Sequence, residues 1–238
     1  GGINDQSFNQ GVWEGLKKAN ADFGYEVSYQ ESKEASDYEK NIETLLDAEN
    51  DIIVAAGFNL EEAITEAAKN NPDVQFLIVD AANKEGIENL TGLEFKAEEP
   101  SFLVGYIAGL TTETNKVGFV GGQESTLIKA FEVGYHAGVD QAAKEKGEKI
   151  EFISQYVGNF SDAAKGKSIA TNMYQQGADV VFHASGGAGD GVIEAAKDMD
   201  KWAIGVDRDQ SSIAPDNVLT SAMKRADSAV YKVLENLS

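Results

Sequence analysis

Four short segments of this 238-residue chain hold most of the polar and aromatic residues that could bind a small molecule. They are residues 1–10, 79–82, 182–191 and 205–210. The first precedes an amphipathic stretch, and the other three follow or end short apolar runs rich in β-branched residues, the pattern of buried strands. Ligands of α/β proteins bind in loops at the carboxyl ends of parallel strands. We therefore expect the function to lie in these loops.

The first two segments offer acids and an aromatic ring at the ends of predicted elements. Asp5 or Ser7 can cap the helix that follows, and Phe8 comes too early to belong to the buried face of that helix. Asp80 directly follows an apolar strand. A capped helix with an apolar staple and a turn acid would explain these residues equally well, so a binding role stays open.

The third segment is rich in glycine and lies between a predicted strand and a predicted helix, where anions often bind. It is not a dinucleotide fingerprint, because Val192 stands where a third glycine is needed and Asp190 would repel a pyrophosphate. The glycines permit either a close approach of the backbone to a ligand or a tight turn with positive φ. We expect His183 to pack or hydrogen-bond locally rather than to bind a ligand.

The fourth segment places carboxylates directly after an apolar strand. Ionised Asp207 and Asp209 accept hydrogen bonds only, which suits the two hydroxyls of a vicinal diol. One of them could instead form a surface ion pair with Arg208. After one more strand, Lys224 could direct a cation to the same place, although a lysine at a helix start is usually solvated.

Two other patterns have simpler explanations. Residues 161–168 match a phosphate-binding loop except that Ser161 replaces the first glycine, and they read as part of an amphipathic helix. The acidic pairs at 61–62 and 98–99 lie at predicted helix starts, where the helix dipole favours acids without any catalysis.

The composition excludes several classes of function. The 20 Lys and Arg residues against 40 Asp and Glu give a net charge of −20, which disfavours nucleic acids and anionic membrane surfaces as partners. The chain has no cysteine and two histidines, so disulfides and thiol catalysis are excluded and histidine-based metal sites or triads have few candidates. No apolar run reaches the ~18 residues of a membrane span, and we expect any signal peptide to have been removed.

Strands and helices alternate along the sequence, which predicts two α/β lobes, each a parallel sheet flanked by helices. The predicted strands are 25–30, 51–56, 74–80, 90–95, 116–121, 150–156, 180–184, 202–207 and 218–223. The predicted helices are 7–23, 37–49, 60–70, 100–113, 127–146, 162–176, 191–198 and 225–237. The first residues read as a turn without a preceding strand and the chain stops on a helix, so we expect a chain truncated at both ends.

Several stretches, in order, resemble the basic membrane protein (BMP, PnrA-like) family of substrate-binding lipoproteins. They are GGINDQSFNQ at 1–10 with Trp13-Glu14-Gly15, FKAEEPSFLVG at 95–105, VGFVGG at 117–122, FEVGYHAG at 131–138, ADVVFHASGG at 178–187 and GVDRDQ at 205–210. The resemblance covers essentially the whole chain. It implies the two-lobed type I periplasmic-binding-protein fold, with the ligand in the interlobe cleft, and delivery of purine nucleosides to an ABC importer.

The resemblance also implies a set of ligand-binding residues: Asp5, Phe8, Asn9, Asp80, Phe182, Gly187, Asp207 and Lys224. The rings of residues 8 and 182 would stack on opposite faces of the nucleobase, and the side chains at 5 and 9 would bond its polar edge. Those at 207 and 224 would hold the ribose hydroxyls. The glycine at 187 would let the backbone approach, and the acid at 80 would line the cleft. Because a phosphate beside an acid is repelled, we expect nucleosides rather than nucleotides.

By the family layout, residues 1–110 with 218–238 would form the first lobe and 113–216 the second, with hinges near 111–115 and 216–221. We expect capture by lobe closure, no catalytic residue, no cofactor or metal, an ABC permease as partner, and a monomer. We expect the protein outside the cytoplasm, lipid-anchored to the cell membrane through a part that this chain lacks. Two alternatives stay open: a sensor with the same fold, and, less favoured, a nucleoside hydrolase, which would need more aspartates near the start than Asp5 alone before Asp22.

Overall fold

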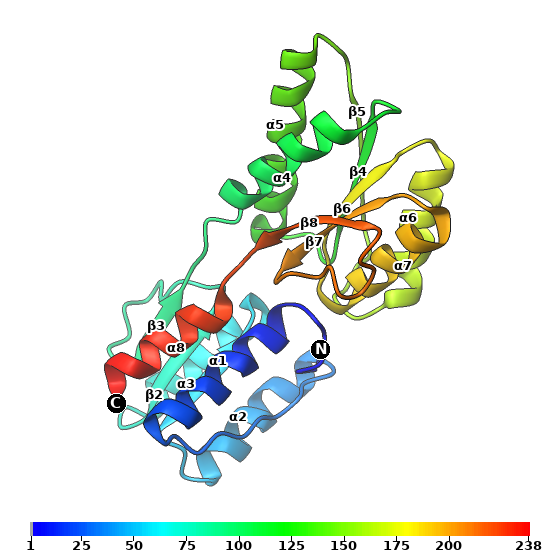
Figure 1. The fold of residues 1–238 in the computed structure, drawn as a ribbon. Coiled ribbons are helices and arrows are strands. Elements are labelled where there is room, and N and C mark those ends of the chain that lie inside the picture. Colours follow the sequence, from blue (N-terminus) through cyan, green and yellow to red (C-terminus); the bar gives the residue numbers. More distant parts are fainter. Residues whose placement is uncertain (1) are drawn as a thin grey trace. The chain divides into compact units, whose positions relative to one another are not determined.

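The computed structural model describes residues 2–238 and confirms the α/β class. These residues form two compact units. Unit 1 comprises the residues up to Asn4, Asn9–Phe95 and Ala226–Ser238, and unit 2 comprises Asp5–Phe8 and Lys96–Arg225. Each unit contains a parallel sheet with helices packed against it (Figure 1).

In unit 1, three parallel strands lie in the order β1(Ile52–Ala56), β2(Gln75–Val79), β3(Leu90–Leu93). The helices are α1(Phe8–Phe23), α2(Tyr38–Asp47), α3(Glu61–Asn70) and α8(Ala226–Leu237), with single 3₁₀ turns at Ala35–Asp37 and Phe58–Leu60. Alternate apolar residues of β1 and β2, such as Ile53 and Ile78, pack against the apolar stripes of α2 and α3. The apolar spacing read from the sequence thus becomes one buried core.

The predicted strand at 25–30 is wrong: this segment joins no sheet of the described residues. Its aromatic side chains pack against helices instead. The Tyr25 hydroxyl donates to the backbone carbonyl of Leu234 in α8 at 3.0 Å, and the ring of Tyr29 lies edge-on to Trp13 of α1, 5.2 Å between centroids. Apolar alternation indicates a buried face, but it does not supply a neighbouring strand.

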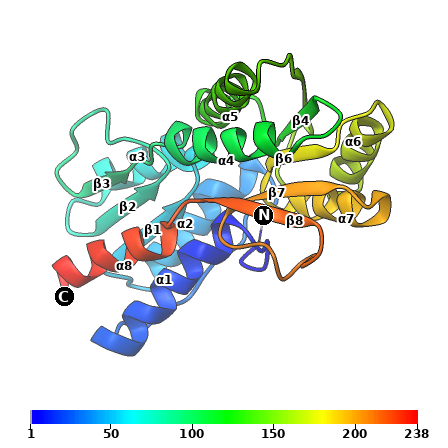
Figure 2. The same ribbon diagram turned by 45° about the horizontal axis from the view of Figure 1, so that its top comes forward.

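In unit 2, five parallel strands lie in the order β5(Glu151–Tyr156), β4(Lys116–Gly121), β6(Val180–Ala184), β7(Trp202–Asp207), β8(Val218–Met223). The helices α4(Glu98–Thr111) and α5(Thr126–Lys146) cover one face, and α6(Ala163–Gln175) and α7(Gly189–Met199) cover the other (Figure 2). A 3₁₀ turn at Gly186–Ala188 precedes α7. All the predicted helices and the other predicted strands are present, with ends within two residues of the predictions.

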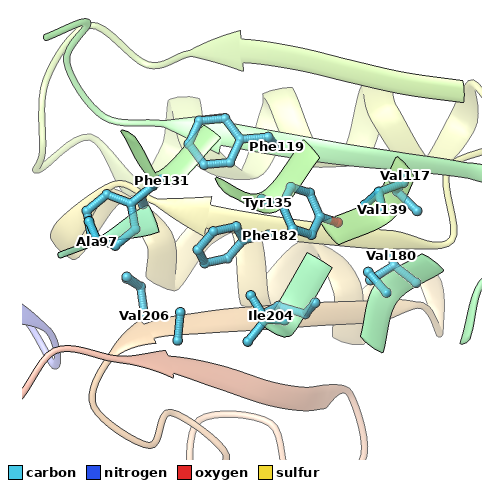
Figure 3. Close-up of a cluster of buried hydrophobic side chains, with 14 of the residues drawn as sticks. Ala97, Val117, Phe119, Phe131, Tyr135, Val139, Val180, Phe182, Ile204 and Val206 are labelled. Carbon is cyan, nitrogen blue, oxygen red and sulfur yellow. The ribbon is translucent and has the colours of Figure 1, made fainter. Parts of the chain in front are cut away.

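Strict alternation along β6 decides which side chains enter which core layer. Val180 and Phe182 face the layer under α4 and α5, whereas Val181 belongs to the layer under α6 and α7. Figure 3 shows Phe182 inside the first layer. Its ring centroid lies 5.0 Å from that of Tyr135 and 5.6 Å from that of Phe119.

The two compact units have other bounds than the predicted lobes. Helix α4, placed in the first lobe by the prediction 1–110, belongs to unit 2, where it packs along α5. Strand β8, predicted as part of 218–238 in the first lobe, pairs with β7 in the sheet of unit 2. The chain passes between the units at Phe95–Lys96 and Arg225–Ala226, and also on either side of Asp5–Phe8.

The segment predicted as a hinge, 111–115, lies within unit 2 and is hydrogen-bonded there. The buried Asp179 carboxylate accepts hydrogen bonds from the Thr112 hydroxyl at 2.5 Å and from the backbone N–H groups of Glu113 at 2.7 Å and Thr114 at 3.1 Å. Breaking three bonds to a buried carboxylate is costly. The segment at 216–221 likewise lies inside unit 2.

Candidate functional site

Unit 2 contains six of the eight predicted site residues, and Asn9 and Asp80 belong to unit 1. The segment Asp5–Phe8 is part of unit 2 although it is some ninety residues away in sequence from the rest. The side chains around it come from the carboxyl ends of β6, β7 and β8. This is the edge of a parallel sheet where ligand-binding loops are expected.

Asp207 is the last residue of β7 and is 8% exposed. Its carboxylate accepts a hydrogen bond from the buried Ser7 hydroxyl, and its backbone carbonyl accepts from the N–H of Lys224 at 2.8 Å. Its φ is 69°, in the left-handed region. Asp80, directly after β2 in unit 1, also has a left-handed backbone, with a φ of 73°. Aspartate in this region is strained by about 1–2 kcal/mol, and such strain is concentrated at functional sites.

Lys224 follows β8 and is almost buried, 8% exposed. Its ammonium lies 5.5 Å from the centroid of the Phe8 ring and 4.9 Å from that of Phe131 in α5. Both distances are within the range of a cation–π contact. The predicted surface alternative for Lys224, a solvated side chain at a helix start, is therefore wrong. Sequence reasoning missed Phe131, because its place in a helix gave no sign of which strand end it would meet.

A buried chain of hydrogen bonds joins the loops after β6 and β7. His183 Nδ1 lies 3.1 Å from the Ser185 hydroxyl, and His183 Nε2 lies 2.8 Å from Oε1 of Gln210. The same Oε1 accepts from the backbone N–H of Val206 at 2.9 Å, so it is an oxygen acceptor and Nε2 must carry the proton. Full burial lowers the pKa of His183 to about 4. His183 is therefore a neutral, locally bonded residue, as predicted.

The loop after β6 brings a second acid near Asp5. Asp190 lies in the first turn of α7, and no group of residues 2–238 donates to its buried Oδ1. Burial, and secondly the charge of Asp5, raise the pKa of Asp190 to about 6. A Cβ added at Gly187 would lie 3.7 Å from Cβ of Asp5 and 3.5 Å from the carbonyl oxygen of Phe160. Asp5, Gly187 and Phe160 are thus neighbours.

The two patterns set aside in the sequence are structural, as predicted. Asp162 caps α6 by accepting from the N–H of Lys165 at 2.9 Å, so residues 161–168 form a helix start and its first turns. The acidic pairs lie in the first turns of α3 and α4. No group of three acids or histidines within residues 2–238 is arranged to hold a metal ion. No helix in that range has both the length and the hydropathy needed to cross a membrane.

A family model described as "ABC transporter substrate-binding protein PnrA-like" matches residues 1–238. The chain belongs to this family. The family is one of transport-system binding proteins, which agrees with the prediction that the protein is not an enzyme. Binding proteins of ABC transporters work outside the cytoplasm, as predicted.

Curated relatives support the membership of this PnrA-like protein. It is 42% identical to the "CD4+ T-cell-stimulating antigen" of Listeria monocytogenes, over 97% of this chain and 69% of the relative. It is 40% identical to "Basic membrane protein A" of Borreliella burgdorferi, over 94% and 66%. It is 44% identical to the "ABC transporter nucleoside-binding protein BmpA" of Lactococcus lactis, over 88% and 62%. The chain thus spans about two thirds of the length of these relatives.

Solved structures confirm the two-lobed fold of the PnrA-like protein. A solute-binding protein of an ABC transporter system from Aeropyrum pernix superposes with a TM-score of 0.94 at 29% identity, over all of this chain and 68% of the other. A glucose-galactose binding protein from Geobacillus stearothermophilus, GanP, has a TM-score of 0.67 at 16% identity, over 96% and 84%, and shows the fold alone.

One predicted site residue of this PnrA-like protein lies in the aromatic core. Phe182 is 0% exposed and surrounded by the rings of Phe119, Phe131 and Tyr135, so it offers no free face to a nucleobase (Figure 3). The cause is the two-residue alternation of β6, which turns residue 182 into the core. The partly exposed ring beside the loop at Gly187 is that of Phe160.

Proposed function

We propose that this protein captures a purine nucleoside outside the cytoplasm and delivers it to an ABC permease. The observation that carries the proposal is the position of the Lys224 ammonium between the rings of Phe8 and Phe131, next to the backbone of Asp207. A cation, a carboxylate and an aromatic ring at one sheet edge suit a ligand with a hydroxylated sugar and a flat base. The relative from Lactococcus lactis, named a nucleoside-binding protein, supports the same ligand class.

We assign the ribose to Asp207 and Lys224. A carboxylate is an acceptor and an ammonium is a donor, so together they match a vicinal diol, whose hydroxyls both donate and accept. A ligand phosphate would meet Asp207, Asp5 and Asp190, in a chain with a net charge of −20. We therefore expect nucleosides to bind better than nucleotides.

We assign the base to the aromatic and acidic groups around the segment 5–8. Phe8 would stack on one face of the base, and Phe160 replaces Phe182 as the candidate for the other. Asp5 and Asp190 would accept from the N–H groups of the base; the unpaired Oδ1 of Asp190 supports this, because a buried acceptor gains most from a new donor. Gly187 would let the backbone come close. Asn9 and Asp80, from unit 1, keep their predicted roles at the base edge and in the cleft.

We also propose that the two lobes close on the ligand. The protein would act as a monomer, held at the membrane by a lipid anchor. The chain passages at Phe95–Lys96 and Arg225–Ala226 replace the predicted hinges as the segments that would bend. A binding protein needs such a change so that the permease can distinguish its loaded from its empty form.

The test is a thermal-shift screen followed by calorimetry on guanosine, inosine, adenosine, cytidine, uridine, GMP, ribose and an amino-acid mixture. A ligand that binds the native state stabilises it by RT ln(1 + [L]/Kd), so at equal concentrations a tighter ligand raises Tm more. Shifts with purine nucleosides, and weaker ones with GMP and free ribose, would support the proposal. A shift with amino acids or sugars alone would overturn it. Free ribose released from inosine would instead show a hydrolase.

A further inference from the structure

The side chain of Gln210 lies at the centre of the hydrogen-bond network between the strand ends, and it is 1% exposed. Its Oε1 accepts from His183 and from the backbone of Val206, as described above. Its Nε2 donates to the backbone carbonyl of Gln6 at 2.9 Å. Its own N–H donates to the Ser221 hydroxyl of β8 at 3.2 Å.

Only an amide side chain can make all of these side-chain hydrogen bonds, because they require both an acceptor and a donor. Val206 N–H and the proton on His183 Nε2 both need an acceptor, and the Gln6 carbonyl needs a donor. An amide offers an acceptor oxygen and a donor nitrogen on one carbon. A buried donor or acceptor left unpaired is costly, which favours this orientation of the amide.

The Gln6 carbonyl belongs to a turn with an unfavourable backbone conformation. Gln6 has a φ of 52°, in the left-handed region that a glutamine adopts at a cost. On one side of it, the Asp5 carboxylate accepts from the N–H of Ser7 at 2.9 Å. On the other side, the Ser7 hydroxyl donates to Asp207. The hydrogen bond from the Gln210 amide thus joins this turn to the strand ends, as the Ser7–Asp207 bond does.

We propose that Gln210 is a positioning residue for ligand binding: its amide holds the turn at Gln6, and thereby orients Asp5 and Phe8. This inference rests on the proposed function, since Asp5 and Phe8 are the groups that would touch the base. Gln210 itself, being buried and fully engaged, does not contact the ligand.

The sharpest variant is Gln210→Glu. It has nearly the same shape and keeps the acceptor for Val206 and His183, but an ionised carboxylate cannot donate to the Gln6 carbonyl. We expect purine-nucleoside Kd to rise about tenfold near pH 8, as for one lost hydrogen bond with its acceptor left unpaired.

Two comparisons isolate position 210 in this experiment. Because a carboxylate at 210 would also change the titration of His183, 2.8 Å from the Gln210 oxygen, the Kd values of the variant and the unchanged protein are compared near pH 8. Gln175→Glu, at the exposed end of α6, adds the same charge and should leave Kd unchanged. A Kd ratio of one for Gln210→Glu would overturn the inference.

Two measurements test the hydrogen bond from Gln210 to the turn without any ligand. Amide hydrogen exchange should be faster in Gln210→Glu for peptides containing residues 5–8, and unchanged in Gln175→Glu. In the unchanged protein, the Gln210 side-chain amide protons should show nuclear Overhauser contacts to Gln6 or Ser7, which requires no variant to fold. Absence of these contacts, or equal exchange, would refute this hydrogen bond. If the expected exchange difference and the Overhauser contacts were both seen but the unchanged protein bound no nucleoside, the proposed function would be refuted. That result would still support the hydrogen bond from Gln210 to the turn at Gln6.

Discussion

The hydroxyl of Ser7 donates a buried hydrogen bond to the carboxylate of Asp207, a residue 200 positions further along the chain. Ser7 is 0% exposed, and the sequence suggested for it no more than a cap at the start of a helix. The Asp5 carboxylate accepts from the N–H of Ser7, an Asx turn directly before the helix. The Ser7–Asp207 contact fixes the direction of a carboxylate that we assign to the ribose.

Ser7→Ala should therefore weaken nucleoside binding by about three- to tenfold, because a hydrogen bond to a charged group is worth about 1.5–3 kcal/mol and only part of it affects the ligand. The loss should be larger for ribonucleosides than for 2′-deoxynucleosides, measured by calorimetry. Ser161→Ala, in the exposed loop before α6, is the control. An unchanged ratio of ribo- to deoxynucleoside affinity would show that Ser7 does not orient Asp207 for the sugar.

Phe8→Ala and Phe160→Ala should each weaken purine-nucleoside binding by roughly 5- to 100-fold, the equivalent of 1–3 kcal/mol for one base stack. Phe182→Leu should instead lower Tm, because the ring fills the core between Phe119 and Tyr135, and should leave Kd unchanged in the folded protein. If Phe182→Leu raised Kd as much as Phe8→Ala, Phe182 would be a ligand-binding residue after all.

His183 should make the protein less stable in acid. Its pKa falls from 6.5 to about 4 on folding, so the unfolded chain binds more protons between these values. Stability is therefore complete above pH 6.5 and is lost as the pH falls towards 4, by on the order of 3 kcal/mol. His183→Gln should remove this part of the pH dependence of the unfolding free energy. His136→Gln, at the other and exposed histidine, should not.

Asp190 should make the protein less stable as the pH rises, the opposite of the effect of His183. The pKa of Asp190 rises to about 6 on folding, so the folded chain binds more protons than the unfolded one between about 4 and 6. Stability is then lost as the pH rises through 6. Above pH 6, Asp190→Asn should be more stable than the unchanged protein, by less than about 1 kcal/mol because the group is half-exposed. Near pH 4 the two proteins should be equally stable.

The same substitution should weaken purine-nucleoside binding at neutral pH, because an amide is a poorer acceptor for base N–H groups than a carboxylate. Denaturant melts and calorimetry check the two effects. Asp216→Asn, at an exposed position, is the control. A stability curve for Asp190→Asn that runs parallel to that of the unchanged protein at all pH values would contradict this prediction.

Gly186 and Gly187 should respond differently to alanine. Gly186 has a φ of 57°, and a Cβ there would lie 3.1 Å from the carbonyl oxygen of Phe160. Gly186→Ala should cost about 1–2 kcal/mol of stability. A Cβ at Gly187 would make ordinary contacts, so Gly187→Ala should leave Tm nearly unchanged but weaken ligand binding if the backbone lies against the ligand. Equal losses of Tm would contradict the distinction.

The secondary-structure elements and the family could be predicted from the amino-acid sequence alone. Apolar spacing predicted every α-helix and strand of the described residues, and one further strand at 25–30 that does not form, because the periods of 3.6 and 2 are local properties of the chain. Motifs spread from residue 1 to residue 210 indicated the PnrA-like family, which the comparisons confirmed. Asp5, Asp80 and Asp207 stood out because acids at the ends of apolar strands and before helices are visible without a structure.

Which side chains meet could be learned only from the folded chain. Whether 25–30 is a strand depended on a neighbouring strand, and the division into units depended on α4 packing along α5. Phe182 and His183 are adjacent in sequence, yet the pleat of β6 turns one into the aromatic core and the other to Gln210. Ser7, Phe131 and Gln210 act through partners dozens to hundreds of positions away. Such pairings are set by the global packing of the chain, on which local spacing carries no information.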